Sequence, residues 1–230
     1  MRKFDYTFLK KISVPADIMN SATSIYEMKA KAELRRTDFA DVFSAMESVA
    51  KIQSVKSSNA IEGIITTDKR IRDIVNKSTV PQGHNELEIA GYRDALDLIH
   101  SSYSDIPFSE KSILELHRML LQPSGDDLAG KYKTEDNFIM ETDRRGVRSV
   151  RFTPVPASET SAAMEQLILA YHATYSESEI NPLLLIPCVI LDFLCIHPFR
   201  DGNECQDCCR CCCYIKAGSA RANMCRLRNR

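Results

Sequence analysis

The sequence predicts an all-α domain that carries one short β-hairpin. Apolar residues recur at helical spacing through most of the chain, and only the stretch from about 137 to 154 changes to a strand-like pattern. There, two β-prone runs flank Asp143-Arg144-Arg145-Gly146, whose residues favour a tight turn. The 230 residues are 44% hydrophobic and 27% charged, a composition typical of globular proteins.

The helices are predicted from their caps and apolar faces. One runs from Asp38 to about Ile61, and a second covers about 84–100. A third begins at the capping residue Ser109 and ends near Leu121, and helical spacing resumes at about 158–171. The last begins at Asn181, with Pro182 in its first turn, and runs into His197. In the first of these helices the apolar residues at helical spacing are Phe39, Val42, Phe43, Met46, Val49 and Ala50.

Charge and cysteine content restrict the environment and the partners. The net charge is −1 and gives no indication of a nucleic-acid or membrane surface. The longest apolar stretch, 182–196, is shorter than the roughly 20 residues that a membrane-spanning helix needs. Seven of the nine cysteines follow residue 200, which is unlike the even distribution in secreted disulfide-rich proteins. We therefore expect a cytoplasmic protein.

The run from His197 to Asn203 is the main candidate site. Gly202 can adopt positive φ, so successive backbone N–H groups can face an anion. Asp201 can hold Mg²⁺, which binds a few carboxylate oxygens together with substrate phosphates. His197 can remove a proton from an attacking hydroxyl. A lone His or a lone Asp-Gly is more often part of a polar turn, but the combination favours a phosphate-binding catalytic loop.

This run resembles the signature of the Fic (Fido) family, His-x-Phe-x-Asp-Gly-Asn-Gly-Arg-x-x-Arg. The resemblance implies a Fic-type helical domain that transfers AMP from ATP, with Mg²⁺, to a hydroxyl of a target protein. It also implies that His197 is the general base, that Asp201 is the Mg²⁺ ligand and that Phe199 anchors the loop in the core. The residues implied to surround the nucleotide are Phe199, Arg200, Asp201, Gly202 and Asn203, together with Glu62.

The resemblance extends to the hairpin. Residues 130–133 (Gly-Lys-Tyr-Lys) and the hairpin at about 137–154 are similar to the family's flap, which docks a segment of the target protein by strand addition. His117 stands where the family often has a histidine, and we interpret it as structural. A homo-oligomer is compatible with the sequence.

A second motif resembles the family's inhibitory helix. Ser58 and Glu62 are four residues apart and share a helix face, and Gly63 can end the helix. In the family this Glu pairs with the second Arg of the signature, so Glu62 is implied to be the regulator, with Ser58 and Gly63 completing the motif. The predicted organisation is an N-terminal helical region (1–83, with the inhibitory helix at about 38–63), a Fic core (84–203) and an aberrant cysteine-rich tail (204–230).

The signature is interrupted after Asn203. Glu204, Cys205 and Cys208 stand where the family has Gly and two Arg. Reading degenerate codons for this run one nucleotide earlier permits Arg-Met-Ser-Arg-Leu-Leu, so we expect an out-of-frame sequence from about residue 204 that cuts the signature short. A zinc or redox site at Cys205 and Cys208 is an alternative, although no second spaced pair accompanies them.

The interruption leaves three functional interpretations. The first is an AMP transferase that is inactive in this chain. The second is a catalytically silent Fic-like module that binds a protein partner. The third is transfer of another phosphate-containing group, such as UMP or phosphocholine.

Overall fold

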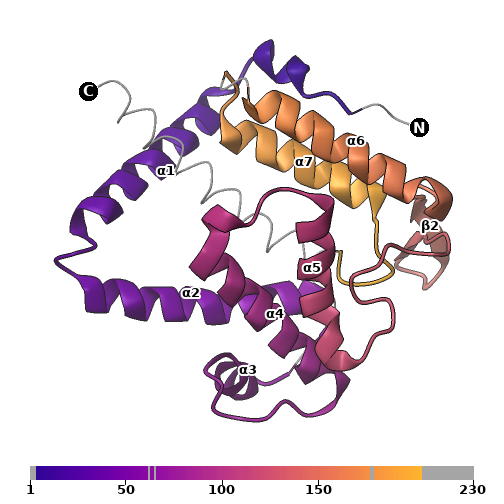
Figure 1. The fold of residues 1–230 in the computed structure, drawn as a ribbon, viewed down its shortest axis with the longest axis horizontal. Coiled ribbons are helices and arrows are strands. Elements are labelled where there is room, and N and C mark those ends of the chain that lie inside the picture. The colour runs from indigo at the N-terminus through magenta and orange to yellow at the C-terminus, as the bar shows by residue number, and fades with distance from the viewer. Residues whose placement is uncertain (1–3, 62, 65, 177–178, 204–230) are drawn as a thin grey trace.

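The computed structural model describes residues 4–61, 63–64, 66–176 and 179–203. This part of the chain consists of α-helices, short 3-10 turns and one two-stranded antiparallel sheet, which confirms the predicted all-α fold with one hairpin (Figure 1). The elements are α1 Ala16–Arg35, α2 Ala40–Ile61, α3 Asp68–Val75, α4 Gly83–Ser102, α5 Glu110–Leu121, β1 Ile139–Thr142, β2 Arg148–Phe152, α6 Ala157–Ser176 and α7 Pro182–Ile196.

Two apolar cores lie on either side of α5. One joins α6 and α7 with the N-terminal segment, in which the phenol of Tyr6 donates a 3.0 Å hydrogen bond to the buried carboxylate of Asp192 on α7. The other joins α2, α3, α4 and α5, so residues before and after position 83 share one core. Ile113 of α5 belongs to the first core, whereas Leu116 and Leu120 belong to the second. Helix α5 therefore connects the two halves of the molecule.

Helices α4 and α5 approach each other closely at Gly91. A Cβ atom at this position would lie only 2.1 Å from the carbonyl oxygen of Leu120, a distance that no side chain can tolerate. The missing side chain therefore lets α4 lie directly against the C-terminal turn of α5. His117 lies on α5, about one turn before this contact.

The predicted helix ends have the expected capping contacts. The side chain of Asn181 accepts from the N–H of Leu183 at the start of α7, and that of Ser109 accepts from Ser112 at the start of α5. At the end of α2, Gly63 has φ +78°, and its N–H donates to Ala60 while the N–H of Ile64 donates to Asn59. This pair of bonds is the Schellman arrangement, so Gly63 ends the helix as predicted.

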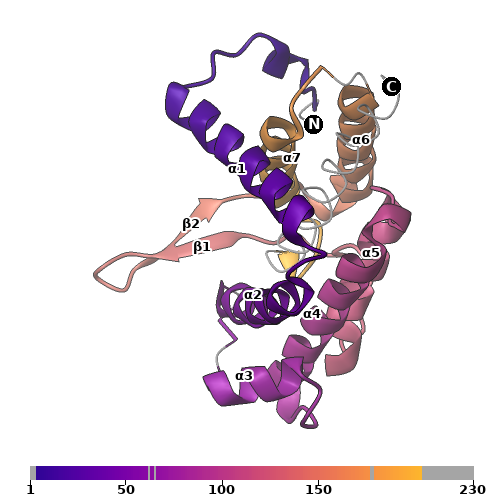
Figure 2. The same cartoon turned by 90° about the vertical axis from the view of Figure 1, so that its left-hand side faces the viewer.

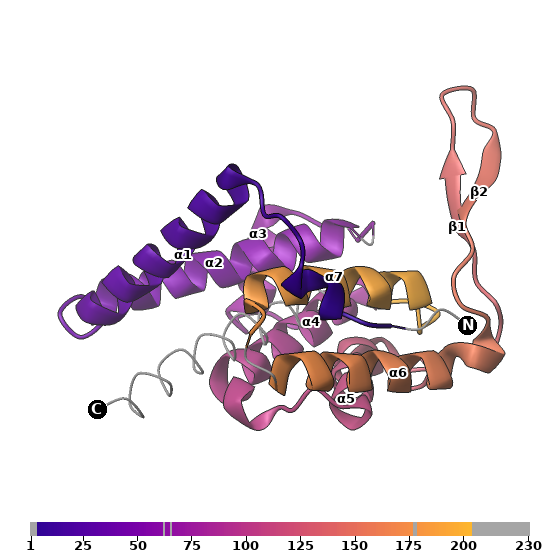
Figure 3. The same cartoon turned by 90° about the horizontal axis from the view of Figure 1, so that it is seen from above.

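The hairpin projects away from the helices (Figures 2 and 3). Its strands pair with Met140 opposite Val150 and Thr142 opposite Arg148, and the register shifts between Ile139 and Met140. All residues of β2 are exposed, and so are those of β1 after Ile139.

Two features differ from the sequence prediction. Helices α1 and α3 were not predicted, and α1 buries none of its residues. In α2 the helix is correct, but the apolar side chains of Phe39, Val42, Met46 and Val49 are exposed, and the buried face instead contains Val55, Ser58 and Asn59. None of the helices in the described ranges is both long enough and apolar enough to cross a lipid bilayer.

Candidate active site

The loop from His197 to Asn203 begins where α7 ends. His197 is half-buried and adopts a left-handed conformation, with φ 50° and ψ 62°, and its N–H donates a 2.8 Å hydrogen bond to Phe193. Pro198 follows, and a residue before proline is disfavoured in the α region, so the helix ends here. A left-handed conformation is strained for histidine, by roughly 1–3 kcal/mol, and such strain is common at functional sites. The structure therefore fixes the backbone of the predicted base in an unusual conformation.

Phe199 holds the loop in the core. Its side chain is fully buried, and its ring stacks on His117 with the ring centres 3.7 Å apart and the planes at 10°. Tyr132 and Phe193 contact the same ring at centroid distances of 5.7 and 6.2 Å. These contacts are what an anchoring residue requires.

The backbone of the loop is held by the segment that leads into the hairpin. The N–H of Lys133 donates to the carbonyl of Pro198 at 2.9 Å, and its ammonium donates to the carbonyl of Ile196 at 3.3 Å. The amide of Asn137 donates to the carbonyl of Phe199 at 3.1 Å and accepts from the Lys133 ammonium at 2.7 Å. Burial lowers the pKa of Lys133 to about 8, against the opposing effect of Asp136. Lys133 and Asn137 thus connect the hairpin base to the loop, a role that sequence reasoning missed.

Asn203 closes the loop on itself. Its side-chain oxygen accepts from the N–H of Phe199, and its amide donates to the carbonyl of the same residue, both at 3.0 Å. Because Asn203 is buried, these two bonds also satisfy its polar atoms. The residue therefore shapes the turn in which Gly202 adopts φ +73°.

His117 supports the loop from α5. Its Nδ1 accepts from the N–H of Gly130 at 2.9 Å, so Nε2 carries the proton and donates to the carbonyl of Asp201 at 3.1 Å. Burial lowers the pKa of His117 to about 4, although Asp201 and Asp126 oppose this shift. A neutral imidazole with both nitrogens engaged acts as a structural link between α5, residue 130 and the loop. This geometry agrees with the structural interpretation of His117.

The charges around Asp201 favour a cation. Asp201 is exposed, and one of its carboxylate oxygens accepts a 2.8 Å hydrogen bond from the N–H of Gly202. Burial raises the pKa of Glu88 on α4, a shift that the nearby carboxylates of Asp201 and Asp126 increase and that His84, 2.8 Å away, opposes. Arg200 is exposed and donates to Asp126 at 2.8 Å. The predicted metal ligand therefore lies in a negative region, whereas Arg200 pairs with a carboxylate.

The end of α2 lies beside this loop. Asn59 and Ile64 line a cavity of about 20 Å³ that Asp201 and Gly202 also line. Ser58 is buried and shares a 2.9 Å hydrogen bond with the hydroxyl of Tyr92, which lines the same cavity. The predicted inhibitory motif and the predicted catalytic loop are thus neighbours in space, although more than 130 residues separate them in the sequence. Glu62 itself lies outside the described residues, as do Glu204, Cys205 and Cys208.

The residues in the described ranges fit one Mg²⁺ ligand but no complete metal site. No three of their His, Cys, Asp and Glu side chains are grouped so that they could hold an ion by themselves. Mg²⁺ is commonly held by one or two carboxylates together with substrate phosphates. The exposed carboxylate of Asp201 suits that kind of site.

Comparison with known proteins gives a family match for the second half of the described chain. The sequence profile described as Fic/DOC family matches residues 107–205, the segment from α5 to the loop. No curated protein matches the chain.

Solved structures share the fold. A Fic family protein from Desulfovibrio desulfuricans G20 aligns with a TM-score of 0.72 at 17% identity, over 90% of this chain and 59% of that one. A Fic domain containing signaling protein from Bacteroides thetaiotaomicron VPI-5482 gives 0.61 at 22% identity, over 72% and 62%. Fic-1 from C. elegans gives 0.61 at 18% identity, over 88% and 60%. The chain thus spans about three fifths of the length of these structures.

The profile match covers the anchored loop and the hairpin that holds it, and the helical fold agrees with that of Fic-domain structures. Residues 107–205 are thus similar in sequence to the Fic/DOC family, and the described part of the chain shares the fold of Fic-domain structures.

Proposed function

We propose that this Fic domain is built to transfer AMP from ATP to a hydroxyl side chain of a target protein. The observation that carries the proposal is the fixed loop: His197 is held in a left-handed conformation, and the backbone after it is hydrogen-bonded by Lys133, Asn137 and His117. A catalytic group whose position is set before substrate binds loses little entropy when the reaction begins. Preorganisation of this kind is what a transferase loop needs.

Each loop residue has a role in this proposal. His197 accepts the proton of the target hydroxyl while the oxygen of that hydroxyl attacks the α-phosphate of ATP and pyrophosphate leaves. Asp201 holds Mg²⁺, which neutralises phosphate charge when bound. Gly202 and Asn203 shape the turn around the phosphates, Phe199 anchors it, and Arg200 lies at its exposed rim.

Glu62 is proposed as the regulator. Asn59 and Ile64, on either side of position 62, line the same small cavity as Asp201 and Gly202. A cavity of about 20 Å³ has room for about one water molecule, so the residues on either side of position 62 lie close to the proposed catalytic loop. The proximity supports a regulatory helix end at the nucleotide site.

The residues after Asn203 do not fit a phosphate site. Glu204 adds a negative charge where the family's signature has Gly, and Cys205 and Cys208 lack the bidentate donors of the arginines that they replace. Loss of one preorganised donor costs roughly 10²–10³ in rate, so this chain should transfer no measurable AMP. The silent protein-binding module remains the second candidate, favoured by this same run of residues. The cytoplasmic location also remains a prediction.

A four-protein comparison tests the proposal. The proteins are the present chain, a repaired chain in which Asn203 is followed by Gly-Arg-Met-Ser-Arg-Leu-Leu, the repaired chain with Glu62→Gly, and that variant with His197→Ala. With α-labelled ATP and Mg²⁺, we expect no labelling, weak labelling, strong labelling and no labelling, in that order.

Each comparison addresses a separate claim. Labelling by the present chain would show that the residues after Asn203 are dispensable, provided that a fifth protein, the present chain with His197→Ala, is not labelled. Equal labelling with and without Glu62→Gly would refute the regulatory role. If the repaired proteins consume UTP or a phosphocholine donor instead of ATP, the AMP assignment is wrong.

A further inference from the structure

The hairpin is a two-stranded sheet with no partner strand among the residues that the structure describes. Both of its long edges carry backbone groups that can pair with another chain. An isolated two-stranded hairpin is only marginally stable in water. Its exposed apolar side chains, Met140, Val147, Val150 and Phe152, suggest a surface that another chain covers.

The tip of this hairpin has a defined structure. The carboxylate of Asp143 accepts from the N–H groups of Arg145 and Val147 at 2.8 and 2.9 Å. The N–H of Gly146 donates to the carbonyl of Asp143, and Gly146 adopts φ +82°. The turn therefore places Arg144 and Arg145 at the tip of the hairpin, which projects away from the helices (Figure 3).

The charge of the hairpin is opposite to that of the chain. Between 137 and 154 the sequence has only two acidic residues but four arginines, Arg144, Arg145, Arg148 and Arg151. The whole chain, in contrast, has a net charge of −1. Both acidic groups are already engaged: Glu141 lies 4.0 Å from Arg151, and Asp143 accepts from the turn. Among the described residues, no carboxylate pairs with Arg144, Arg145 or Arg148. These three arginines form what we call the tip cluster.

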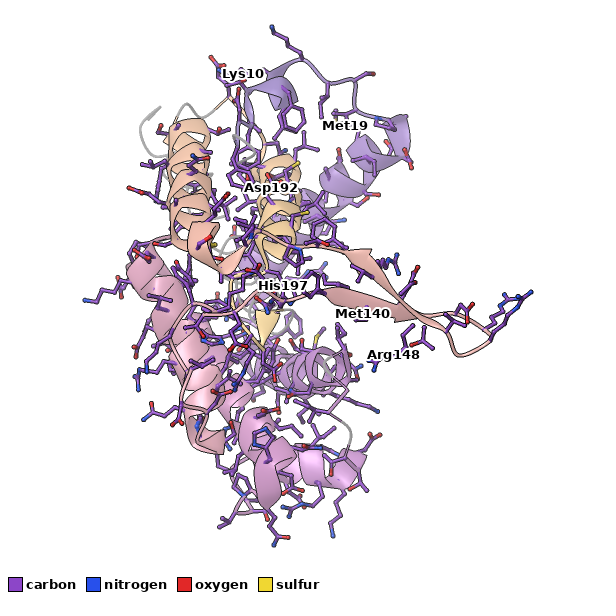
Figure 4. All side chains as sticks on the ribbon, turned by 90° about the vertical axis from the view of Figure 1, so that its right-hand side faces the viewer. Lys10, Met19, Met140, Arg148, Asp192 and His197 are labelled. Carbon is purple, nitrogen blue, oxygen red and sulfur yellow. The ribbon has the colours of Figure 1, made fainter. Side chains whose placement is uncertain are left out.

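The hairpin connects the tip cluster to the loop that contains His197. Asn137 at the base of the hairpin donates to the carbonyl of Phe199 in the catalytic loop. Met140 and Arg148 lie farther out along the hairpin than His197 (Figure 4). Their positions in the register, opposite Val150 and Thr142, place both side chains on one face of the sheet. A strand added along the hairpin would therefore run from the catalytic loop to the tip cluster.

We propose that the hairpin selects an acidic, extended segment of the target protein, whose carboxylates pair with Arg144, Arg145 and Arg148. This inference rests on the proposed function, transfer to a target protein, and on the sequence similarity of the hairpin to the family's flap. Arg148 lies opposite Thr142, which is five residues beyond Asn137 at the loop, so the acidic residues of an added strand lie about five positions or more from the modified hydroxyl. Guanidinium groups bind carboxylates through two parallel hydrogen bonds, which suits recognition by arginine.

Binding, rather than transfer, tests the proposal. The probe is a fluorescent peptide with a run of glutamates about five residues from a single threonine, and its partner is a peptide with lysines in place of the glutamates. By fluorescence anisotropy with the present chain, we expect the acidic peptide to bind at least about tenfold more tightly than the basic one. The difference should shrink as salt screens the exposed arginines. Equal affinity for the two peptides would overturn the proposal.

A matched pair of triple variants locates the site. Arg144→Glu, Arg145→Glu and Arg148→Glu together should weaken binding of the acidic peptide by about tenfold. The control triple, Lys11→Glu, Arg35→Glu and Lys69→Glu, changes the net charge equally at exposed positions outside the hairpin and should bind like the unaltered chain. Equal losses in the two triples would show that only overall charge matters, which overturns the assignment to the tip cluster.

Two further probes separate the remaining outcomes. Methylation of alternate peptide N–H groups removes strand pairing but keeps the charge, so unchanged affinity would refute strand addition. Displacement of the peptide by an oligonucleotide of equal charge, at equal affinity, would indicate a general polyanion surface and overturn selection of a protein segment. Because no readout requires transfer, failure of AMP transfer in the repaired chain leaves these results independent.

Discussion

Acidification should destabilise the fold through His117. Burial lowers its pKa from the ordinary 6.5 to about 4, so between these values the unfolded chain binds a proton that the folded chain does not. For a pKa depressed by folding, stability is fully present above about pH 6.5 and is lost as the pH falls towards about 4. Between about pH 7 and pH 5 the linkage amounts to about 2 kcal/mol, a large part of the 5–15 kcal/mol typical of a domain.

Urea unfolding at several pH values measures this effect. His117→Gln keeps a donor and an acceptor but cannot titrate, so its loss of unfolding free energy between these pH values should be about 2 kcal/mol smaller than that of the unaltered chain. Ser101→Ala, at an exposed position that does not titrate, is the control for substitution itself and should leave the pH dependence of the chain unchanged. Parallel pH dependences for the unaltered chain and His117→Gln would refute the reasoning.

Two further substitutions test how the loop and its support are built. Gly91→Ala should lower the free energy of unfolding by about 3 kcal/mol or more, because the new Cβ would meet the carbonyl of Leu120. Ser101→Ala, at an exposed position of the same helix, is the control and should have little effect in urea unfolding. Asn203→Ala should remove both hydrogen bonds to Phe199 and leave its buried N–H and C=O without these partners, at a cost of about 2–3 kcal/mol, and speed hydrogen exchange at Phe199. Asn203→Asp keeps only the acceptor, so its free energy of unfolding and its hydrogen exchange rate at Phe199 should lie between those of the unaltered chain and those of Asn203→Ala. Unchanged exchange in Asn203→Ala would contradict the proposed closing role of this side chain.

Local signals in the sequence were sufficient for most of the fold. Ser109, Asn181 and Gly63 predicted helix ends because capping depends on neighbouring residues alone. The hairpin was predicted for the same reason, since Asp143 and Gly146 specify its turn. Helix α3 also carried a usable signal that was overlooked: Thr67 caps it, and Ile71, Ile74 and Val75 form its buried face.

The apolar face of α2 shows where local reasoning fails. Phe39, Val42 and Met46 have helical spacing, yet they are exposed, and a pattern of this kind predicts a helix without saying what covers it. The supports of the catalytic loop were missed for a different physical reason. The side chains of Lys133 and Asn137 donate hydrogen bonds to backbone carbonyls more than 60 residues away. Neither a lysine nor an asparagine in a sequence indicates such a long-range contact.

The contacts that hold the loop separate its shape from its chemistry. His117, Lys133, Asn137 and Asn203 all precede position 204, and together they fix the backbone of residues 197–203. The same segment, 130–137, leads into the hairpin, so the loop and the proposed docking surface are parts of one hydrogen-bonded unit. The positions at which the family has its two phosphate-binding arginines come after that unit. A change after Asn203 would therefore remove the proposed transfer and leave the hairpin, the proposed docking surface, in place. A silent binding module and an interrupted transferase thus share one scaffold, and separate assays of binding and transfer distinguish them.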